Sequence, residues 1–397
     1  MKGLLIRTPL VFSPTFSSLT GSKVYLKLET LQLAGSFKVR GAAFRIIARR
    51  EEIGPQGVIA ASAGNHAQGV AVAARLAGVP ATVVMPVNSS IAKQEAARGY
   101  GARVILYGTN LSESIGRAKE LSKDGMTFIH PYDDPDVIAG QGTCGLEILE
   151  EIPKPDLVVV PVGGGGLISG IATAVKETHP ACRIVGVQSA RCPAMYRAIK
   201  GEPPIDRTCR SIADGIVVKE PGRITLPIIR KYVDDLVLVD DDQIADAMFL
   251  LLERKRVVAE GAGAAPLAAL LNGGIWHAEG STIVLVISGG NVDSALLGRV
   301  IRQGQMKGGR ILRLYAVLED IPGELAKLLG IIATAQGNIL YIHHMRGERD
   351  LPVTSIRMEI ELETKGKEHG DKIIHALVSA GYSIHPEDDS SPSRPSL

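Results

Sequence analysis

Short apolar runs alternate with helical segments through most of this chain, and this alternation constrains the fold more than any other feature. The runs GVIAAS, ATVVMP, RVILYG, MTFIHP, LVVVPV, RIVGVQS, DDLVLVD and TIVLVIS have the length of strands and lie between residues 57 and 290. Ala-rich or amphipathic stretches such as AQGVAVAARLAG and IAKQEAARGYGA lie between them. Strand and helix in repeated succession predict an α/β fold, with parallel sheets covered by helices on both faces.

The composition fits this class and excludes several others. Hydrophobic residues make up 45% of the chain and aromatic residues only 4%, and the formal net charge is +2. Interspersed charges of this kind indicate no nucleic-acid partner and no membrane partner. The apolar runs are far shorter than the ~18 residues of a membrane span, and the N-terminus lacks the pattern of a signal peptide. Because the four cysteines also lack CxxC spacing, we expect reduced thiols and a cytoplasmic location.

The residue composition and the pattern of predicted elements change near residue 302. The polar, glycine-containing stretch RQGQMKGGR, residues 302–310, is interpreted as a linker. Residues 310–386 then follow the order strand, helix, strand, strand, helix, strand, which predicts a ferredoxin-like βαββαβ domain. Residues 387–397 are polar and rich in Ser and Pro, so we expect a disordered tail.

Three loops at the carboxyl ends of predicted strands are candidates for ligand binding. SAGNHAQG, residues 62–69, leads from a strand into a helix whose N-terminus favours an anion, although an ordinary turn capped by Asn65 is the alternative. The run Gly163 to Gly166 would let the backbone wrap closely around a phosphate, and a flexible loop is its alternative. It matches neither GxGxxG nor GxxxxGK[ST]. Ser288, in SGGN, would be able to hold a ring nitrogen, but a plain turn explains it as well.

Lys38 lies in LAGSFKVRG, between Phe37 and Val39. A solvated lysine at the start of a helix is the simplest interpretation, since most lysines are exposed. A lysine desolvated beside Phe37 would instead have a lowered pKa and would act as a nucleophile or a base. Together with a phosphate cradle, a carboxylate-binding turn and a partner for a ring nitrogen, such a lysine meets the needs of pyridoxal phosphate acting on an amino acid.

The motifs SFKVRGA, SAGNHAQG, PYDDPDVIAGQGT, GGGGLISG and SGGN, in this order, resemble those of fold-type II pyridoxal-phosphate enzymes, with threonine dehydratase (threonine ammonia-lyase) as the nearest branch. The resemblance covers about residues 5–300. It implies a two-lobed catalytic domain over residues 1–305, with a small lobe at approximately 40–145 inserted in the larger one. It implies that the cofactor, pyridoxal 5'-phosphate, is bound covalently by Lys38 and held by Phe37, Asn65 (phenolic oxygen), Gly163, Gly164, Gly165, Gly166 (phosphate) and Ser288 (pyridine nitrogen).

The resemblance also implies a site for the substrate carboxylate, formed by Ser62, Ala63, Gly64, Asn65 and His66. Serine racemases have a second serine at the position of Ala63, and because alanine cannot donate a proton, elimination is favoured over racemisation. Gln188 and Ala194 stand where racemases carry carboxylates, so no divalent metal is expected. A monovalent cation near Glu260–Ala265 is suggested by the resemblance alone. The SAGNH turn also differs from the GNTG-type turn of cysteine synthases, which argues against a sulfhydrylase.

The C-terminal pattern resembles an ACT domain, an amino-acid-binding regulatory module. The implied effector residues are Asp320, Gly323 and Asn338, expected close to one pocket, and a dimerisation module without a ligand is the alternative. His343 and His344 are adjacent on a predicted strand and face opposite ways, so they are poor joint metal ligands. The family also implies a homo-oligomer, either a dimer or a tetramer.

The resulting hypothesis is a regulated lyase. Lys38 would act as the general base in β-elimination from L-threonine, and from L-serine, giving 2-oxobutanoate or pyruvate and ammonia. An amino acid bound to the ACT domain would regulate the reaction, either in isoleucine biosynthesis or in threonine degradation. Two alternatives remain: a serine dehydratase or racemase, and an amino-acid sensor that has lost catalysis. The presence of Lys38, Asn65, the four glycines and Ser288 argues against the sensor.

Overall fold

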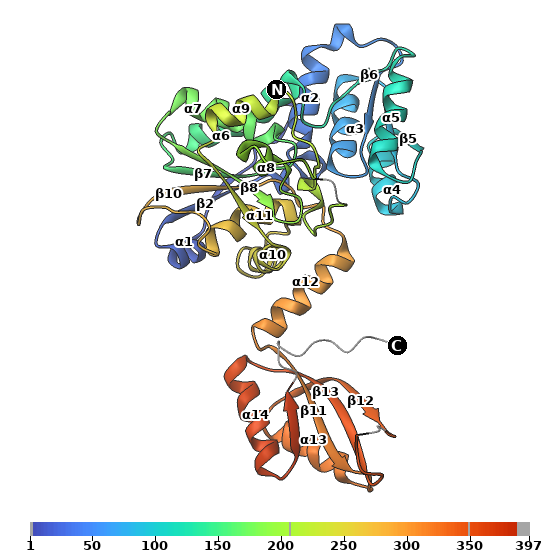
Figure 1. Ribbon diagram of the computed structural model, residues 1–397, viewed down its shortest axis with the longest axis vertical. Helices are drawn as coiled ribbons and strands as arrows, with labels where there is room; N and C mark the ends of the chain where they lie inside the picture. The colour runs from blue at the N-terminus through green and yellow to red at the C-terminus, as the bar shows by residue number, and fades with distance from the viewer. Residues whose placement is uncertain (1–2, 206–207, 348–349, 387–397) are drawn as a thin grey trace. The chain divides into compact units, whose positions relative to one another are not determined.

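The computed structural model describes residues 3–205, 208–347 and 350–386. By its internal contacts the chain divides into two compact units, Met1–Leu296 and Leu297–Leu397 (Figure 1). The tail predicted to be disordered, residues 387–397, lies outside the described residues. Among those residues, no helix is both long enough and apolar enough to cross a membrane.

The first unit contains a six-stranded sheet in the order β1-β2-β10-β7-β8-β9. All neighbours are parallel except β1, which runs antiparallel to β2. The central strands β7 and β10 are buried along nearly their whole length, as expected when helices cover both faces. The strands are β1 (Leu10–Phe12), β2 (Lys23–Leu28), β7 (Leu157–Pro161), β8 (Arg183–Ser189), β9 (Asp235–Val239) and β10 (Thr282–Ile287).

A second sheet of the same unit has the order β5-β4-β3-β6, and its pairs are all parallel. Its strands are β3 (Val58–Ala61), β4 (Ala81–Met85), β5 (Arg103–Leu106) and β6 (Thr127–Phe128). Every apolar run that the sequence predicts as a strand therefore lies in one of the two sheets. The α/β class with parallel sheets is confirmed.

Glycines bring the helices near the predicted lysine into backbone contact. A Cβ atom at Gly140 of α6 would lie 2.6 Å from the carbonyl oxygen of Arg40, and one at Gly69 of α3 would lie 3.0 Å from the backbone of Lys38. Helix α2, which begins at Lys38, is therefore held closely between α3 and α6. The helices of this unit are α1 (Pro14–Thr20), α2 (Lys38–Ala48), α3 (Asn65–Ala77), α4 (Ile91–Gly99), α5 (Leu111–Ser122), α6 (Pro135–Glu151), α7 (Gly166–Thr178), α8 (Ala194–Lys200), α9 (Thr225–Tyr232), α10 (Asp241–Lys255) and α11 (Gly261–Leu271).

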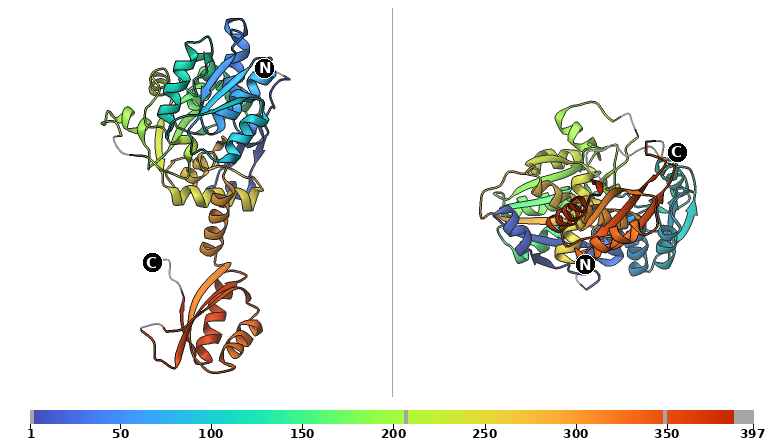
Figure 2. Two further views of the ribbon diagram at one scale, coloured as in Figure 1. Left: turned by 90° about the vertical axis from the view of Figure 1, so that its right-hand side faces the viewer. Right: turned by 90° about the horizontal axis from the view of Figure 1, so that it is seen from below.

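The second unit follows the predicted βαββαβ order and forms an antiparallel sheet, β12-β13-β11-β14. Alternate residues of β11 and β13 are buried with apolar residues of α13 and α14, and both helices lie on one face of the sheet (Figure 2). The unit thus has a core of its own. Its elements are β11 (Ile311–Glu319), α13 (Glu324–Thr334), β12 (Asn338–Met345), β13 (Ser355–Glu363), α14 (Lys367–Ser379) and β14 (Ser383–Pro386).

The stretch interpreted as a linker is mostly helical. Helix α12 (Ser294–Lys307) includes residues 302–307, because Arg, Gln, Met and Lys are good helix formers and outweigh the single Gly304. Arg302 also forms an ion pair with Glu361. The helix ends before Gly308 and Gly309, and Gly309 has a φ of 66°, a left-handed conformation that favours glycine.

Candidate active site

The lysine segment lies directly against the loop that follows β10. Ser36 forms an isolated β-bridge with Gly289, and the Phe37 N–H donates to the Ser288 carbonyl oxygen at 3.0 Å. Helix α2 begins at the next residue, Lys38. The backbone therefore brings together Lys38 and Ser288, which are far apart in the sequence and come from separate predicted motifs.

The amine of Lys38 is held inside the protein. Its Nζ donates a hydrogen bond to the Pro131 carbonyl oxygen at 2.9 Å and lies 5.1 Å from the centroid of the Phe37 ring. Burial lowers the pKa of Lys38 to about 8, and the nearby carboxylate of Glu260 opposes this shift. At pH 7 about a tenth of this amine is neutral, far more than for an exposed lysine, which suits it to act as a nucleophile or base. The alternative of a solvated surface lysine does not fit this environment.

The glycine run that follows β7 has no room for side chains. A Cβ atom at Gly164 would lie 2.5 Å from ring atoms of Tyr132, and one at Gly166 would lie 2.9 Å from the Tyr132 Cα. Gly165 has a φ of 96° and precedes the first residue of α7. The alternative of an unconstrained flexible loop is thus excluded, and the backbone N–H groups at the start of α7 form a cradle suited to a phosphate.

Ser288 is a buried hydroxyl without a partner. Its side chain is 1% exposed, and its Oγ makes no hydrogen bond within the described part of the chain. An unpaired buried hydroxyl is costly, so a group that satisfies it is expected. The orphaned Ser288 Oγ and the glycine cradle fit the ring nitrogen and the phosphate of pyridoxal phosphate.

Asn65 is fixed by a buried carboxylate and a second amide. Its Nδ2 donates to both oxygens of Glu260, at 2.8 and 2.9 Å, and its Oδ1 accepts from the Asn291 Nδ2 at 2.8 Å. Glu260 is 4% exposed, and burial raises its pKa to about 7 against the opposing effect of the Asn65 hydrogen bond. Helix α3 has Gly64 as its N-cap, so the alternative of Asn65 as a simple capping residue is wrong.

The turn between β3 and α3 contains the other predicted substrate residues. The Ser62 Oγ accepts the Gly64 N–H at 3.1 Å, and no neighbouring atom lies within 4 Å of a Cβ placed on Gly64. The side chain of His66 is buried, and its Nε2 lies 2.9 Å from the Ile129 carbonyl oxygen. Burial, and then the charge of Lys38, lower the pKa of His66 to about 3, so the ring is neutral. The turn thus offers the start of α3 to an anion.

The structure does not bring the three predicted effector residues together. Asp320 follows the end of β11 and pairs with Arg346 at 2.8 and 3.0 Å, and Gly323 is the N-cap of α13. Asn338 begins β12, where it pairs with Glu363 opposite the other end of β11. The expectation that Asn338 shares a pocket with Asp320 within this unit is wrong, because α13 first runs back along the sheet, which is about 25–30 Å long.

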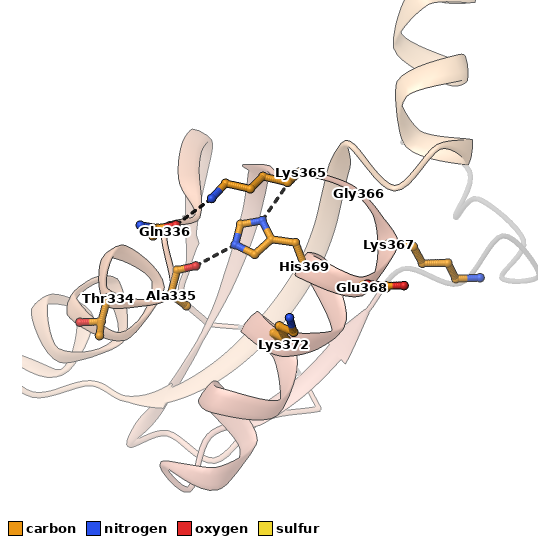
Figure 3. A pocket seen from close by; sticks show the side chains of 9 residues that line it. All are labelled: Thr334, Ala335, Gln336, Lys365, Gly366, Lys367, Glu368, His369 and Lys372. Carbon is orange, nitrogen blue, oxygen red and sulfur yellow. Dashed lines mark hydrogen bonds between the residues drawn. The ribbon is translucent and has the colours of Figure 1, made fainter.

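A pocket of about 720 Å³ lies in the second unit, beside the end of α13 and the start of α14 (Figure 3). His369 links the two sides, with Nε2 2.7 Å from the Ala335 carbonyl oxygen and Nδ1 accepting the Lys365 N–H at 3.0 Å. The Lys365 Nζ donates to the Gln336 side chain at 2.7 Å. The pocket contains none of the predicted effector residues. Its lining residues are Thr334, Ala335, Gln336, Lys365, Gly366, Lys367, Glu368, His369 and Lys372.

Several residues around the site were not assigned a role from the sequence. From the sequence, Glu260 is a candidate only for a monovalent-cation site, although a single carboxylate in the stretch VVAEGAGAAP is a sign of a buried charge. Asn291 and Tyr132 lie in the motifs SGGN and PYDDPDVIAGQGT, which give neither residue a role of its own. Thr225 carries no local sequence signal, because its contact with Gly164 depends on the tertiary fold.

Comparison with known proteins agrees with this geometry. Residues 1–289 match the family described as "Pyridoxal-phosphate dependent enzyme". An L-threonine ammonia-lyase of Thermotoga maritima is 44% identical over 386 residues, which cover 97% of this chain and 96% of that protein.

Two solved structures are similar to about three quarters of this chain. The processed form of threonine deaminase isoform 2 from Solanum lycopersicum has a TM-score of 0.72 and 37% identity, over 75% of this chain and 88% of that one. Maize serine racemase has a TM-score of 0.71 and 36% identity, over 76% of this chain and 94% of that one.

Proposed function

Because the chain belongs to the pyridoxal-phosphate dependent enzymes, we propose that it eliminates the β-hydroxyl of L-threonine and releases 2-oxobutanoate and ammonia. The observation that carries this proposal is the convergence of the Lys38 amine, the Ser288 hydroxyl and the glycine cradle in one unit. The similarity to a threonine ammonia-lyase over almost the whole chain supports the choice of substrate.

Each contact that the cofactor needs has a candidate residue. Lys38 would bind its aldehyde covalently, with Phe37 beside the ring. The N–H groups of Gly163, Gly164, Gly165 and Gly166 would hold the phosphate, Ser288 the ring nitrogen and Asn65 the phenolic oxygen. When bound, the cofactor supplies the electron sink that makes the substrate α-proton acidic.

The residues of the chain supply the proton transfer and the orientation. Lys38, with its lowered pKa, takes the α-proton, and the Pro131 carbonyl oxygen holds the amine in place. The backbone from Ser62 to His66 receives the substrate carboxylate at the start of α3. Overall, the α-proton and the β-hydroxyl are lost together as one water, and hydrolysis of the released enamine gives the keto acid and ammonia.

Ala63 favours elimination over racemisation. Racemisation needs a second acid on the face opposite Lys38, and the methyl group of Ala63 cannot donate a proton. The similarity to maize serine racemase keeps L-serine as a second candidate substrate, with pyruvate or D-serine as the product. We expect keto acid from both amino acids and no D-amino acid from either.

The Lys38→Ala variant tests the assignment. Wild-type protein loaded with pyridoxal phosphate is expected to show the absorbance of a protein-bound imine and to form keto acid from L-threonine. Lys38→Ala is expected to lose both, and retained turnover would refute the role of Lys38. A wild-type protein without imine absorbance would instead support the catalytically inactive sensor.

The second unit is proposed to be a regulatory ACT domain in a cytoplasmic dimer or tetramer with a role in isoleucine biosynthesis. Its βαββαβ order supports the assignment. We propose that the effector binds near Asp320 and Gly323, and that Asn338 of the same copy does not contact it. Kinetics with threonine, with and without isoleucine or valine, test regulation, and an unchanged rate would favour a dimerisation module.

A further inference from the structure

We propose that Asp133 and Thr225 are positioning residues that hold the glycine cradle in the conformation that binds phosphate. The inference rests on the proposed function only in placing the cofactor phosphate at Gly163–Gly166. It starts from the short segment Pro131–Asp133, which lies between β6 and α6 and which contacts both the lysine and the cradle. Neither residue is among the groups that would touch the cofactor.

Asp133 binds the start of a distant helix. One oxygen of its carboxylate accepts the Arg223 N–H at 2.9 Å, and the other accepts the N–H groups of Ile224 and Thr225 at 2.8 and 3.3 Å. Helix α9 begins at Thr225 and has no side-chain cap of its own. Asp133 therefore supplies the missing cap from another part of the chain, where a negative charge is favourable.

Thr225 transmits this restraint to the cradle. Its side chain is fully buried, and its Oγ1 donates to the Gly164 carbonyl oxygen at 2.6 Å. The approach depends on Gly222, where a Cβ atom would lie 2.3 Å from the Asp133 carboxylate and 2.5 Å from the Thr225 Oγ1. With the Gly164 carbonyl held on this side, the orientation of the next peptide N–H is fixed as well.

The same segment contacts the cradle and the amine directly. Tyr132 packs against Gly164 and Gly166, and the Pro131 carbonyl oxygen accepts from the Lys38 Nζ. The Nδ1 of His130 accepts the N–H groups of Tyr132 and Asp133, at 3.3 and 2.8 Å, which fixes the turn. Pro131–Asp133 therefore contacts both the lysine and the glycine cradle, and the carboxylate of Asp133 acts on the cradle through Thr225.

The test compares two aldehydes that differ only in the phosphate. Protein stripped of cofactor is titrated with pyridoxal phosphate or with pyridoxal, and the imine absorbance gives the affinity for each. In Asp133→Asn and Thr225→Val we expect the affinity for pyridoxal phosphate to fall by up to about tenfold, which is the upper end of what one ordinary hydrogen bond contributes. The affinity for pyridoxal is expected to stay nearly unchanged. Thr225→Ser keeps the hydroxyl and should behave as the wild type.

Asp134→Asn is the matched control. This neighbouring carboxylate caps α6 through the N–H groups of Asp136 and Val137 and pairs with Arg45, and none of these partners belongs to α9 or to Gly163–Gly166. The Asp134→Asn variant should prefer pyridoxal phosphate over pyridoxal to the same extent as the wild type. If Asp133→Asn and Thr225→Val lose affinity for both aldehydes alike, or for neither, the proposal is overturned. A wild type that forms no imine with either aldehyde refutes the proposed function itself.

Discussion

At the scale of the residue, the site depends on ionisable groups that burial has moved from their ordinary pKa values. Lys38 and Glu260 are the clearest pair, with pKa values of about 8 and about 7 that result mainly from burial. Each opposes the shift of the other by its charge. The amine is thereby available as a nucleophile near neutral pH, whereas an exposed lysine would be almost fully protonated.

The pKa of Lys38 predicts how the cofactor-free protein captures an aldehyde. Only the neutral amine attacks, so the rate of imine formation with pyridoxal phosphate should rise with pH through a midpoint near pH 8 and then level off. Stopped-flow absorbance across pH 6 to 10 measures this profile. A midpoint near the ordinary value for lysine would show that the amine is solvated.

Glu260 predicts a pH-dependent stability. Its folded pKa of about 7 lies above the value of an unfolded glutamate, so the stabilising contribution is complete at low pH. It is lost as the pH rises through about 7, and the loss is of the order of 2–3 kcal/mol. In urea unfolding of the cofactor-free protein, Glu260→Gln should gain stability relative to the wild type between pH 5 and pH 8. An equal difference at both pH values would contradict this.

At the scale of the element, a buried ionic cluster fixes the start of α2. Arg40 is 1% exposed and binds Glu29, which is fully buried, at 2.7 and 2.8 Å. Arg40 also binds Glu147 of α6, at 2.6 and 2.8 Å, and Lys27 binds the same carboxylate at 2.6 Å. Arg40 lies only two residues after Lys38, so the cluster also fixes the position of the Lys38 backbone, from which the amine extends into the site.

Breaking this cluster from one side should be costly. Glu29→Gln leaves part of the Arg40 charge unpaired in the interior, and we expect the free energy of unfolding to fall by about 3–5 kcal/mol. Glu95→Gln is the matched control, because it breaks the exposed Arg98–Glu95 pair of α4 and should cost less than ~0.5 kcal/mol. Urea unfolding measures both variants, and similar losses would show that burial of the cluster is unimportant.

The elements also show which parts of the fold can be predicted from sequence. The parallel strands β3 to β10 were predictable because they are apolar runs of strand length, and the cradle because a run of glycines after a strand is unusual. The parallel strand β2, KVYLKL, is interrupted by Lys27 and is not such a run. The antiparallel edge strand β1, only three residues long, was missed because it is too short for a periodic pattern. Roles of Asp133 and Thr225 were not predictable, since their contacts join segments about 90 residues apart.

At the scale of the whole molecule, the two units have separate cores, which suggests that catalysis and regulation can be separated. Ending the chain at Lys307 keeps α12 intact, including its residues from 297 onward that belong to the second unit, and removes the βαββαβ part of that unit. Because the residues proposed to bind the cofactor all lie in the first unit, this shortened protein should keep the imine absorbance and form keto acid from L-threonine. Any response of the full-length protein to isoleucine or valine should disappear. Asp320→Ala in the full-length chain is the companion variant, expected to lose the response while keeping the oligomeric state. A response that survives the truncation would place the effector in the first unit and would refute the regulatory role of the second.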